Sequence, residues 1–383
     1  MSHASAFSFE MPTRIEYGMG VVKKVGREIA RLGGRRVLIV TDKGVRRAGL
    51  DALVMSLLGD AGVEWLVYDG VEPNPKDRNV EEGAALAREF GAGAIVALGG
   101  GSPIDCAKSI CVLVTQGGRI KQYEGKGKFE GAVLPWIAIP TTAGTGSEVT
   151  FSSVITDTLN KYKMTVKSPL MAAKVALVDP LLTFSVPPEI TAATGVDALT
   201  HAIEAYTVTC SEPISDAVAL QAIELISQHL RHAVRDGRNP EARAGMMLGS
   251  LLAGIAFSHS DVGSVHCMAE SMGGIYDLPH GVCNAILLPY VMEYNMEYCR
   301  ERYAQIARAM GIYAGVDGAA AAVEAVKSLC VDVGLPALST LGIKSSDLDL
   351  LADMSAKNIS TESNPRPMTK DDYLQVLQRA IKG

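Results

Sequence analysis

Positive charge and long apolar runs are both scarce in this chain of 383 residues. The 36 Lys and Arg are outnumbered by 42 Asp and Glu, which gives a net charge of -6. That balance argues against nucleic acid and anionic membrane surfaces as partners. The apolar run GMMLGSLLAGIAF, which begins at Gly245, is too short to span a bilayer and predicts a buried helix. The partners that we expect are therefore small molecules or further copies of this chain.

Cysteine is also sparse, and its pattern indicates no disulfide framework. The 7 cysteines are an odd number and show no C-x-x-C spacing, which is typical of reduced thiols in the cytoplasm. The N-terminal residues MSHASAFSFEMP lack the cationic and apolar regions of a secretory signal. Cys267 lies next to His266 and should point away from it on a helix, so we expect Cys267 to pack rather than bind a ligand.

Aromatic residues make up 5% of the chain, yet 48% of it is hydrophobic and 20% charged, as in an ordinary globular protein. Its length suits two domains. Short β-rich runs alternate with amphipathic segments in the first half, whereas helical periodicity dominates after the prolines at 187 and 188. We predict an α/β domain at 1–186 and an all-helical domain at 187–383, with surface loops at 125–131 and 362–367 and strands at 37–41, 65–68, 95–98 and 137–140.

Histidine is scarce as well, with 7 in the chain, which makes three of them informative. Asp197 and His201 lie four residues apart in GVDALTHAIEAY, and His266 and His280 fall in VHCMAESMGGIYDLPHG. An i, i+4 pair shares one face of a helix, so a carboxylate and an imidazole could bind one ion there. Such a set suits a divalent first-row metal better than calcium or magnesium. A surface hydrogen bond is the alternative, but the small apolar neighbours favour a metal site.

A glycine-rich turn predicts an anion site in the first half. Gly99, Gly100, Gly101 and Ser102 follow the strand AIVAL in GGGSPIDCAK and open a helix, placed here at Ser102. Glycines let the backbone approach a ligand, and the free N–H groups of a first helical turn favour phosphate. The alternative is a plain turn with Ser102 as the N-cap and Pro103 first in the helix. The G-x-G-x-x-G fingerprint is missing after the first strand.

Two further segments at strand ends point to a nucleotide. Asp42 ends VLIVTD, where a carboxylate would bind a ribose hydroxyl and select NAD over NADP, its alternative role being a helix cap. Thr141, Thr142, Thr145 and Ser147 supply hydroxyls in IPTTAGTGSEVT, which suit a pyrophosphate or a nicotinamide amide. Three such segments at the carboxyl ends of strands are typical of ligand binding in α/β sheets.

Taken together, these blocks resemble the iron-containing (group III) alcohol dehydrogenases over nearly the whole chain. The match rests on VTDKG, VEPNP, GGGSPIDCAK, IPTTAGTGSEVT, ATGVDALTHAIEAY and PHGVCNAILLPYVMEYN. The resemblance implies a dehydroquinate-synthase-like fold, in which an α/β N-terminal domain binds NAD(P) and an all-α C-terminal domain holds the metal. It also implies a homodimer or a higher homo-oligomer.

The resemblance assigns roles residue by residue. It places the metal ligands on Asp197, His201, His266 and His280. It places the coenzyme contacts on Asp42, Asn74, Gly99, Gly100, Gly101, Ser102, Thr141, Thr142, Thr145, Lys163 and Leu182. Asn74 and Lys163 rest on the resemblance alone, because an Asn in PNP is normally a turn residue and a Lys in NKYKM a solvated charge.

The chain departs from the family one helical turn after His266. Many members carry a second histidine there, beside nicotinamide and substrate, whereas this chain has Glu270 in HCMAES. Glu270 could accept a proton in a relay, contact a polar substrate group, bind the metal or make a structural hydrogen bond. We favour the relay or the polar contact, and we rank metal ligation last.

The function implied is a metal-dependent, NAD(H)-linked alcohol dehydrogenase that interconverts a small primary alcohol or diol and its aldehyde. The metal would act as a Lewis acid for hydride transfer. Iron is expected from the resemblance, with zinc as the alternative, since the ligand set binds both. The alternative functions are a zinc polyol dehydrogenase, a dehydroquinate-synthase-type lyase and a filament-forming assembly protein. Phe151, Phe257 and Cys283 are candidate walls of the substrate pocket.

Overall fold

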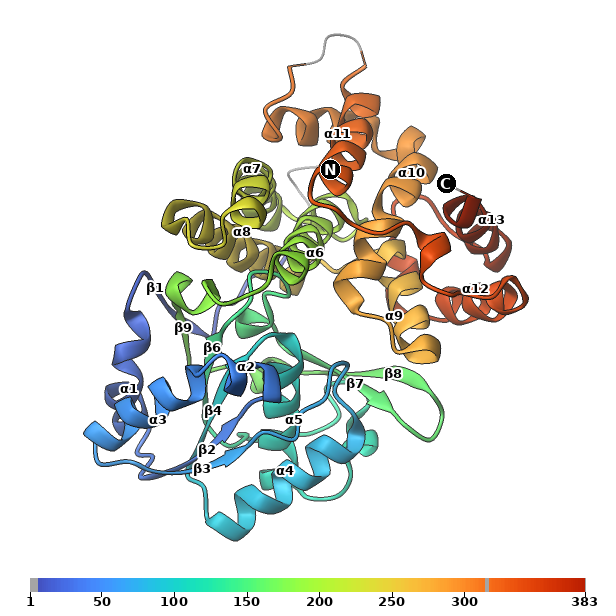
Figure 1. Ribbon diagram of the computed structural model, residues 1–383. Coiled ribbons are helices and arrows are strands. Elements are labelled where there is room, and N and C mark those ends of the chain that lie inside the picture. Colours follow the sequence, from blue (N-terminus) through green and yellow to red (C-terminus); the bar gives the residue numbers. More distant parts are fainter. Residues whose placement is uncertain (1–5, 314–316, 383) are drawn as a thin grey trace.

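The computed structural model describes residues 6–313 and 317–382, and it combines a sheet-containing half with a helical half. Figure 1 shows the strands in the lower part of the molecule and the helices α6 to α13 above them. All the named strands precede α6 along the chain. The predicted fold class, an α/β part followed by an all-helical part, is confirmed.

A six-stranded parallel sheet forms the centre of the first half. Its strands lie in the order β1 (Arg14–Tyr17), β9 (Val175–Val178), β6 (Trp136–Pro140), β4 (Ala94–Gly99), β2 (Arg36–Val40) and β3 (Glu64–Tyr68). Sheets of this kind are covered on both faces, so their central strands consist of apolar residues with little alternation. The four predicted strands are confirmed. The sequence analysis missed β1 and β9, which are short and lie at one side of the sheet.

Helices pack on both faces of this sheet. Successive residues of β2 point to opposite faces: Ile39 packs with α1 (Val25–Arg31) and α3 (Leu50–Asp60), whereas Leu38 packs with α4 (Asp77–Phe90) and α5 (Gly101–Gln116). A short helix, α2 (Lys43–Arg47), follows β2 directly. The loop that follows the carboxyl end of β6 lies against the helical half, with Gly144 close to Thr194 and Gly146 close to Gly254. Ligands bind at the carboxyl ends of the strands in such sheets.

A second, three-stranded sheet extends from the first half toward α9. Its strands are β5 (Gly125–Lys126), β8 (Tyr162–Lys167) and β7 (Ser152–Asp157), and β7 and β8 form an antiparallel hairpin. The prediction of a surface loop at 125–131 was wrong at its first two residues, because they pair with the end of β8. The hairpin was also missed, since its strands carry Lys, Ser and Asp among few apolar residues.

The helical half is built around α6, which is buried along most of its length. Three of its helices begin with proline, which suits the first helical position because that N–H needs no partner within the helix. The helices are α6 (Pro188–Thr207), α7 (Pro213–Arg235), α8 (Pro240–His259), α9 (Ser264–Tyr276), α10 (His280–Ala309), α11 (Gly318–Asp332), α12 (Leu348–Ala356) and α13 (Lys370–Lys382).

The apolar run at Gly245 lies in α8, as predicted, and this helix joins the two cores. Met246 belongs to the core of the helical half, while Met247 and Leu251 pack into the core under the large sheet. Within the described part of the chain, no helix combines the length and the apolarity needed to cross a membrane.

Short 3-10 helices connect the larger elements, and one of them corrects a prediction. The segment 362–367 is more than a surface loop: it contains the end of a 3-10 helix and Asn364, which is buried and exchanges two hydrogen bonds with Asn295. The 3-10 helices are Val21–Lys24, Ile120–Tyr123, Ser147–Val149, Pro169–Met171, Pro180–Thr183, Leu338–Thr340, Ser345–Asp347 and Ile359–Ser363.

Candidate active site

The four predicted metal ligands come together where α6, α9 and α10 meet. Asp197 and His201 lie one turn apart on α6, His266 lies on α9 and His280 is the first residue of α10. Ligand atoms of Asp197, His201 and His266 all lie within 4.8 Å of one another, and the three side chains are buried. His280 lies at the edge of this group, with its Nε2 4.0 Å from Asp197 Oδ1.

A close approach between α10 and α6 brings His280 to this position. A Cβ added at Gly281 would lie 2.7 Å from the carbonyl oxygen of Ala193 and 3.3 Å from Cβ of Asp197. Glycine is therefore required after His280, because any side chain would push the start of α10 away from α6. The chain reverses before this point at Asp277, a residue with φ of 54° that ends α9.

The protonation of these side chains fits a divalent cation. Burial lowers the pKa of His201 and His280, and the neighbouring His266 adds to the effect, so these imidazoles are neutral and have a free lone pair. Burial raises the pKa of Asp197, opposed by His266, Asn284 and Lys163. Burial lowers the pKa of His266, but the neighbouring carboxylates of Glu204 and Asp197 outweigh this effect and raise it. Nδ1 of His201 and Nδ1 of His280 are buried and have no hydrogen-bond partner among the described residues. Three imidazoles and one carboxylate form a suitable set for iron or zinc.

Two side chains that the sequence analysis missed surround the four. Glu204 accepts a hydrogen bond of 2.5 Å from Nδ1 of His266. Asn284 Nδ2 donates to Asp197 Oδ1 at 2.7 Å and lies 3.0 and 3.1 Å from Nε2 of His266 and of His280. Helical spacing could have found both, because Glu204 is three residues after His201 and Asn284 is four residues after His280.

The three candidate wall residues have different surroundings. The ring of Phe257 stacks on His201 with centroids 4.3 Å apart, so it packs directly against a predicted ligand. Phe151 is nearly buried and meets the ring of His259 edge-on. Cys283 is fully buried in the helical core, and burial raises the pKa of its thiol to about 12. Phe257 is therefore the wall candidate with a direct contact to the cluster.

Glu270 lies one turn beyond His266 on α9, outside the group of ligand atoms that approach within 4.8 Å. Its Oε2 accepts a hydrogen bond of 2.6 Å from the amide of Asn358. Burial raises the pKa of Glu270, while Lys163 and Asn358 act in the opposite direction. The structure thus holds this carboxylate through Asn358, the N-cap of the 3-10 helix Ile359–Ser363.

Asn74 and Lys163 link the first half to α9 near this carboxylate. Lys163 Nζ on β8 donates to Asn74 Oδ1 at 2.8 Å. Asn74 Nδ2 in turn donates to Asp277 Oδ1 and to the carbonyl of Leu278. Burial lowers the pKa of Lys163, opposed by Glu270, so this lysine is far from the solvated charge that its sequence context suggests. Neither residue type nor spacing could reveal contacts between segments so far apart in the chain.

The glycine-rich turn and the threonine loop lie against each other. A Cβ added at Gly100 would lie 3.0 Å from Thr142 Oγ1, and one added at Gly101 would lie 2.8 Å from Thr145 Cγ2. Helix α5 begins at Gly101 with Gly100 as its N-cap, so the predicted start at Ser102 was wrong by one residue. No side chain caps this helix, and its first N–H groups remain available for an anion. Thr141 is buried at the end of β6.

Lys108 ties α5 to the segment that follows the threonine loop. This lysine is fully buried, and its Nζ lies 2.7 Å from Ser147 Oγ, Thr150 Oγ1 and the carbonyl oxygen of Ser152. It also lies 3.2 Å from Asp105 Oδ1. A buried ammonium with this many acceptors fixes their positions, because leaving any one unpaired is costly.

Asp42 lies at the carboxyl end of β2, as predicted, and it also caps a helix, which was the alternative role. Its Oδ1 caps α2 by accepting from the N–H groups of Gly44 and Val45, at 2.6 and 2.9 Å. The other carboxylate oxygen makes no hydrogen bond with the described residues, so one carboxylate could serve both a cap and a ribose. Leu182, also predicted to contact coenzyme, packs in the core of the first half.

The buried Glu148 gives a pH-dependent prediction for this loop region. Burial raises its pKa to about 7, opposed by Lys108. The stability that depends on its proton is fully present below pH 4.5 and is lost as the pH rises to 7. The side chain of Glu148→Gln does not titrate, so the variant keeps its stability as the pH rises while wild type loses stability. The free energy of unfolding of the variant should therefore exceed that of wild type by near zero at pH 4.5 and by roughly 3 kcal/mol above pH 7. Chemical denaturation across this range measures the difference.

The exposed Glu241 on α8 offers a matched control. Glu241→Gln should give the same small stability difference at each pH. If the difference between Glu148→Gln and wild type stayed constant from pH 4.5 to pH 8, the assigned burial effect would be wrong.

Comparison with known proteins agrees with this geometry. Residues 12–180 match the family model for iron-containing alcohol dehydrogenase, and residues 191–381 match the model for the C-terminal part of the Fe-containing alcohol dehydrogenase family. The 1,3-propanediol dehydrogenase of Klebsiella pneumoniae is 42% identical, with 98% of this chain and 99% of the relative covered. The NAD-dependent methanol dehydrogenase of Bacillus methanolicus is 39% identical, with 98% and 100% covered.

Solved structures give the same result. A crystal structure of 1,3-propanediol oxidoreductase matches with a TM-score of 0.95 and 42% identity, over 98% of this chain and 100% of that one. The predicted resemblance is confirmed. The chain belongs to the iron-containing alcohol dehydrogenase family, and it is an alcohol oxidoreductase.

Proposed function

We propose that this chain uses iron(II) and NAD(H) to interconvert a small primary alcohol or diol and its aldehyde. The observation that carries the proposal is the buried cluster of Asp197, His201 and His266, with His280 at its edge. Its N₃O composition and its neutral imidazoles fit a divalent ion. The family name supports iron over zinc. The relatives act, by name, on 1,3-propanediol, methanol and lactaldehyde, which supports a small substrate.

The four ligands would hold the ion, which supplies Lewis-acid chemistry that makes an alcohol more acidic and an aldehyde more electrophilic. The surrounding side chains keep the set in place. Asn284 fixes one oxygen of Asp197, and Phe257 fixes the ring plane of His201 by stacking. Apolar residues of α6, α9 and α10 pack around Asp197, His201 and His266, which are buried, while the side chain of His280 stays partly exposed at the edge.

The coenzyme would lie across the carboxyl ends of the strands. The uncapped N–H groups that follow Gly99 and Gly100 at the start of α5 suit its phosphates. The free oxygen of Asp42 suits an adenosine ribose, and the hydroxyls of Thr141, Thr142 and Thr145 line the same edge. Gly101 and Ser102, with Asn74, Lys163 and Leu182, complete the set that we propose. A solved relative at 30% identity, a sulfoacetaldehyde reductase from Bifidobacterium kashiwanohense, is described in complex with NAD+.

The assembly and the location of the protein stay predictions. We propose a homodimer in the cytoplasm, with the domains at 1–186 and 187–383 predicted from the sequence. The cleft between these parts would hold the coenzyme on one side and the metal cluster on the other.

Removal of the metal tests the proposed function. Dialysis against a chelator should lower the rate of NADH-dependent aldehyde reduction at least about 100-fold, because the Lewis acid supplies several kcal/mol of transition-state stabilisation. Anaerobic addition of Fe²⁺ should restore the rate, with Zn²⁺ as the comparison and Mg²⁺ as the negative control. An unchanged rate after verified removal of the metal would contradict the proposal.

Asp42 should select the coenzyme by repelling a 2′-phosphate. Asp42→Ser removes the charge while keeping a side-chain oxygen that can cap α2. We expect kcat/KM for NADPH relative to NADH to rise about 10-fold or more, since each 1.4 kcal/mol of lost repulsion is tenfold. Steady-state kinetics with both coenzymes measure the ratio. Asp60→Ser, on the exposed end of α3, is the control and should leave the ratio unchanged.

Glu270 should act on the substrate side from outside the metal cluster, as a proton acceptor or a polar contact. Glu270→Gln keeps an oxygen that can accept from Asn358 but removes the charge. If Glu270 accepts a proton, kcat of the Glu270→Gln enzyme should fall about 100-fold. If Glu270 is only a polar contact, the substitution should mainly raise KM. The bound metal per chain, measured in parallel, should stay at the wild-type value. Loss of the metal in this variant would show instead that Glu270 is a ligand.

A further inference from the structure

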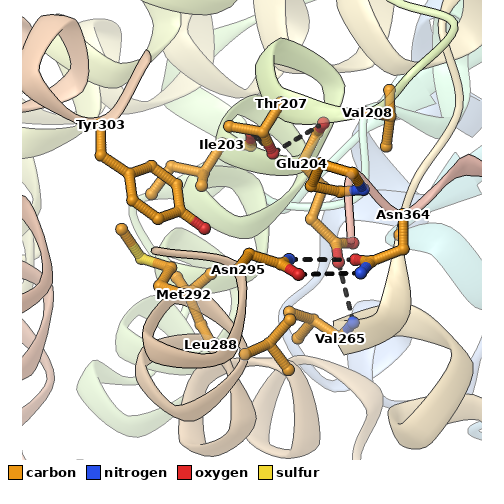
Figure 2. Close-up of a pocket in the computed structure, with 13 residues that line it drawn as sticks. Ile203, Glu204, Thr207, Val208, Val265, Leu288, Met292, Asn295, Tyr303 and Asn364 are labelled. Carbon is orange, nitrogen blue, oxygen red and sulfur yellow. Dashed lines mark hydrogen bonds between the residues drawn. The ribbon is translucent and has the colours of Figure 1, made fainter. Parts of the chain in front are cut away.

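We propose that Glu204 is the positioning residue of the metal cluster: it fixes the tautomer of His266 and caps α9 with the same carboxylate. The inference rests on the proposed metal centre and goes beyond it: Glu204, which is not a ligand, contributes to the affinity of the cluster for the metal ion. Figure 2 shows Glu204 reaching from α6 toward the start of α9, where it bonds the backbone of Val265.

Each oxygen of Glu204 has a defined partner on α9. Oε2 accepts from Nδ1 of His266 at 2.5 Å, and Oε1 accepts from the backbone N–H of Val265 at 2.8 Å. The side chain is 5% exposed and lies in the interior of the helical half. Two directional bonds to adjacent residues fix both the ring plane of His266 and the position of the first turn of α9.

The bond to His266 determines which ring nitrogen carries the proton. An ionised carboxylate can only accept hydrogen bonds, so Nδ1 of His266 must be the donor. With the proton on Nδ1, Nε2 is the ring atom left for a metal, and it faces the cluster, 3.0 Å from Asn284 Nδ2. A carboxylate in this position also makes the imidazole a better ligand, as at other metal sites where a ligand histidine is held by an outer acceptor.

The start of α9 explains why the carboxylate lies there. Its N-cap is Gly263, which has no side chain to bond the free N–H groups of the first turn. Glu204 and Asn364 replace that cap from other parts of the chain, by accepting from Val265 and Ser264. A Cβ at position 263 would lie 2.9 Å from Glu204 Oε1, so glycine leaves room for the carboxylate. The positive end of the helix dipole favours a negative charge at this point.

The cavity that Glu204 lines is too small for a substrate. Its volume is about 10 Å³, and its lining includes Tyr303, Asn295 and Asn364. Figure 2 shows Asn295 and Asn364 facing each other through two hydrogen bonds beside Glu204. A space of this size holds at most a single water. Glu204 therefore acts on the cluster through His266 rather than by touching a substrate.

Glu204→Gln tests the proposal. A glutamine has one acceptor oxygen, so if that oxygen bonds Val265, its NH₂ faces Nδ1 of His266 and favours the tautomer with the proton on Nε2. We expect the dissociation constant for Zn²⁺ to rise 10- to 100-fold, the range for loss of an outer partner at metal sites. Competition with a chromogenic chelator measures the constant on the full chain, without reliance on enzyme activity.

Asn364→Ala is the matched control, because Asn364 also caps α9 but does not touch His266. It should lower the melting temperature as Glu204→Gln does, while leaving the dissociation constant for Zn²⁺ within about threefold of wild type. An equal loss of affinity in both variants would overturn the proposal, since capping alone would then explain it. Wild-type affinity in Glu204→Gln would overturn it as well.

A measurement on the wild-type protein keeps the proposal testable if Glu204→Gln does not fold. Nitrogen NMR of the ¹⁵N-histidine-labelled, metal-free protein should show His266 with its proton on Nδ1, and a proton on Nε2 alone would overturn the inference. The proposed function fails by a separate result: the wild-type chain would bind neither Fe²⁺ nor Zn²⁺.

Discussion

The packing of α6, α9 and α10 around buried imidazoles is the constraint on which the rest of this structure depends. Polar rings in a low-dielectric interior must be compensated, or they destabilise the fold. Here Asp197 lies among the rings, Asn284 donates a hydrogen bond to Asp197, and Glu204 accepts one from His266. A cation would complete this arrangement, since it would neutralise the carboxylate of Asp197 and use the lone pairs of the neutral rings of His201 and His280.

The same packing connects the proposed metal cluster to the edge of the sheet where we propose that the coenzyme binds. Helix α8 contributes Met246 to the helical core and Met247 to the core under the sheet, so the two halves share one helix. On the other side, Lys163 of β8 reaches Asn74 and lies near Glu270 on α9. Hydride transfer needs donor and acceptor held close together, and these two connections fix the distance between the parts that would bind them.

Sequence reasoning could predict the features that depend on local periodicity. The spacing of Asp197 and His201, the strand before Gly99 and the buried helix at Gly245 all follow from it, and the structure has each where expected. The contacts of Lys163 and Asn364 could not be predicted, because they join segments separated by tens to hundreds of residues. The start of α5 was misplaced by one residue, because the extended backbone of Gly100 forms the N-cap and the helix begins at Gly101 instead of Ser102.

The glycine at the start of α9 shows how a weak local sequence can be compensated by distant residues. Glycine is accepted at a helix N-cap, but Gly263 offers no side chain to bond the first N–H groups of α9. In the folded chain that deficiency leaves space for Glu204, whose charge gains both from the helix dipole and from the imidazole that it orients. A side chain at position 263 would lie 2.9 Å from Glu204 Oε1 and 3.2 Å from Asn364 Oδ1, so these two side chains would have to shift. The absence of a side chain at Gly263 therefore leaves the space in which Glu204 can bond both Val265 and His266.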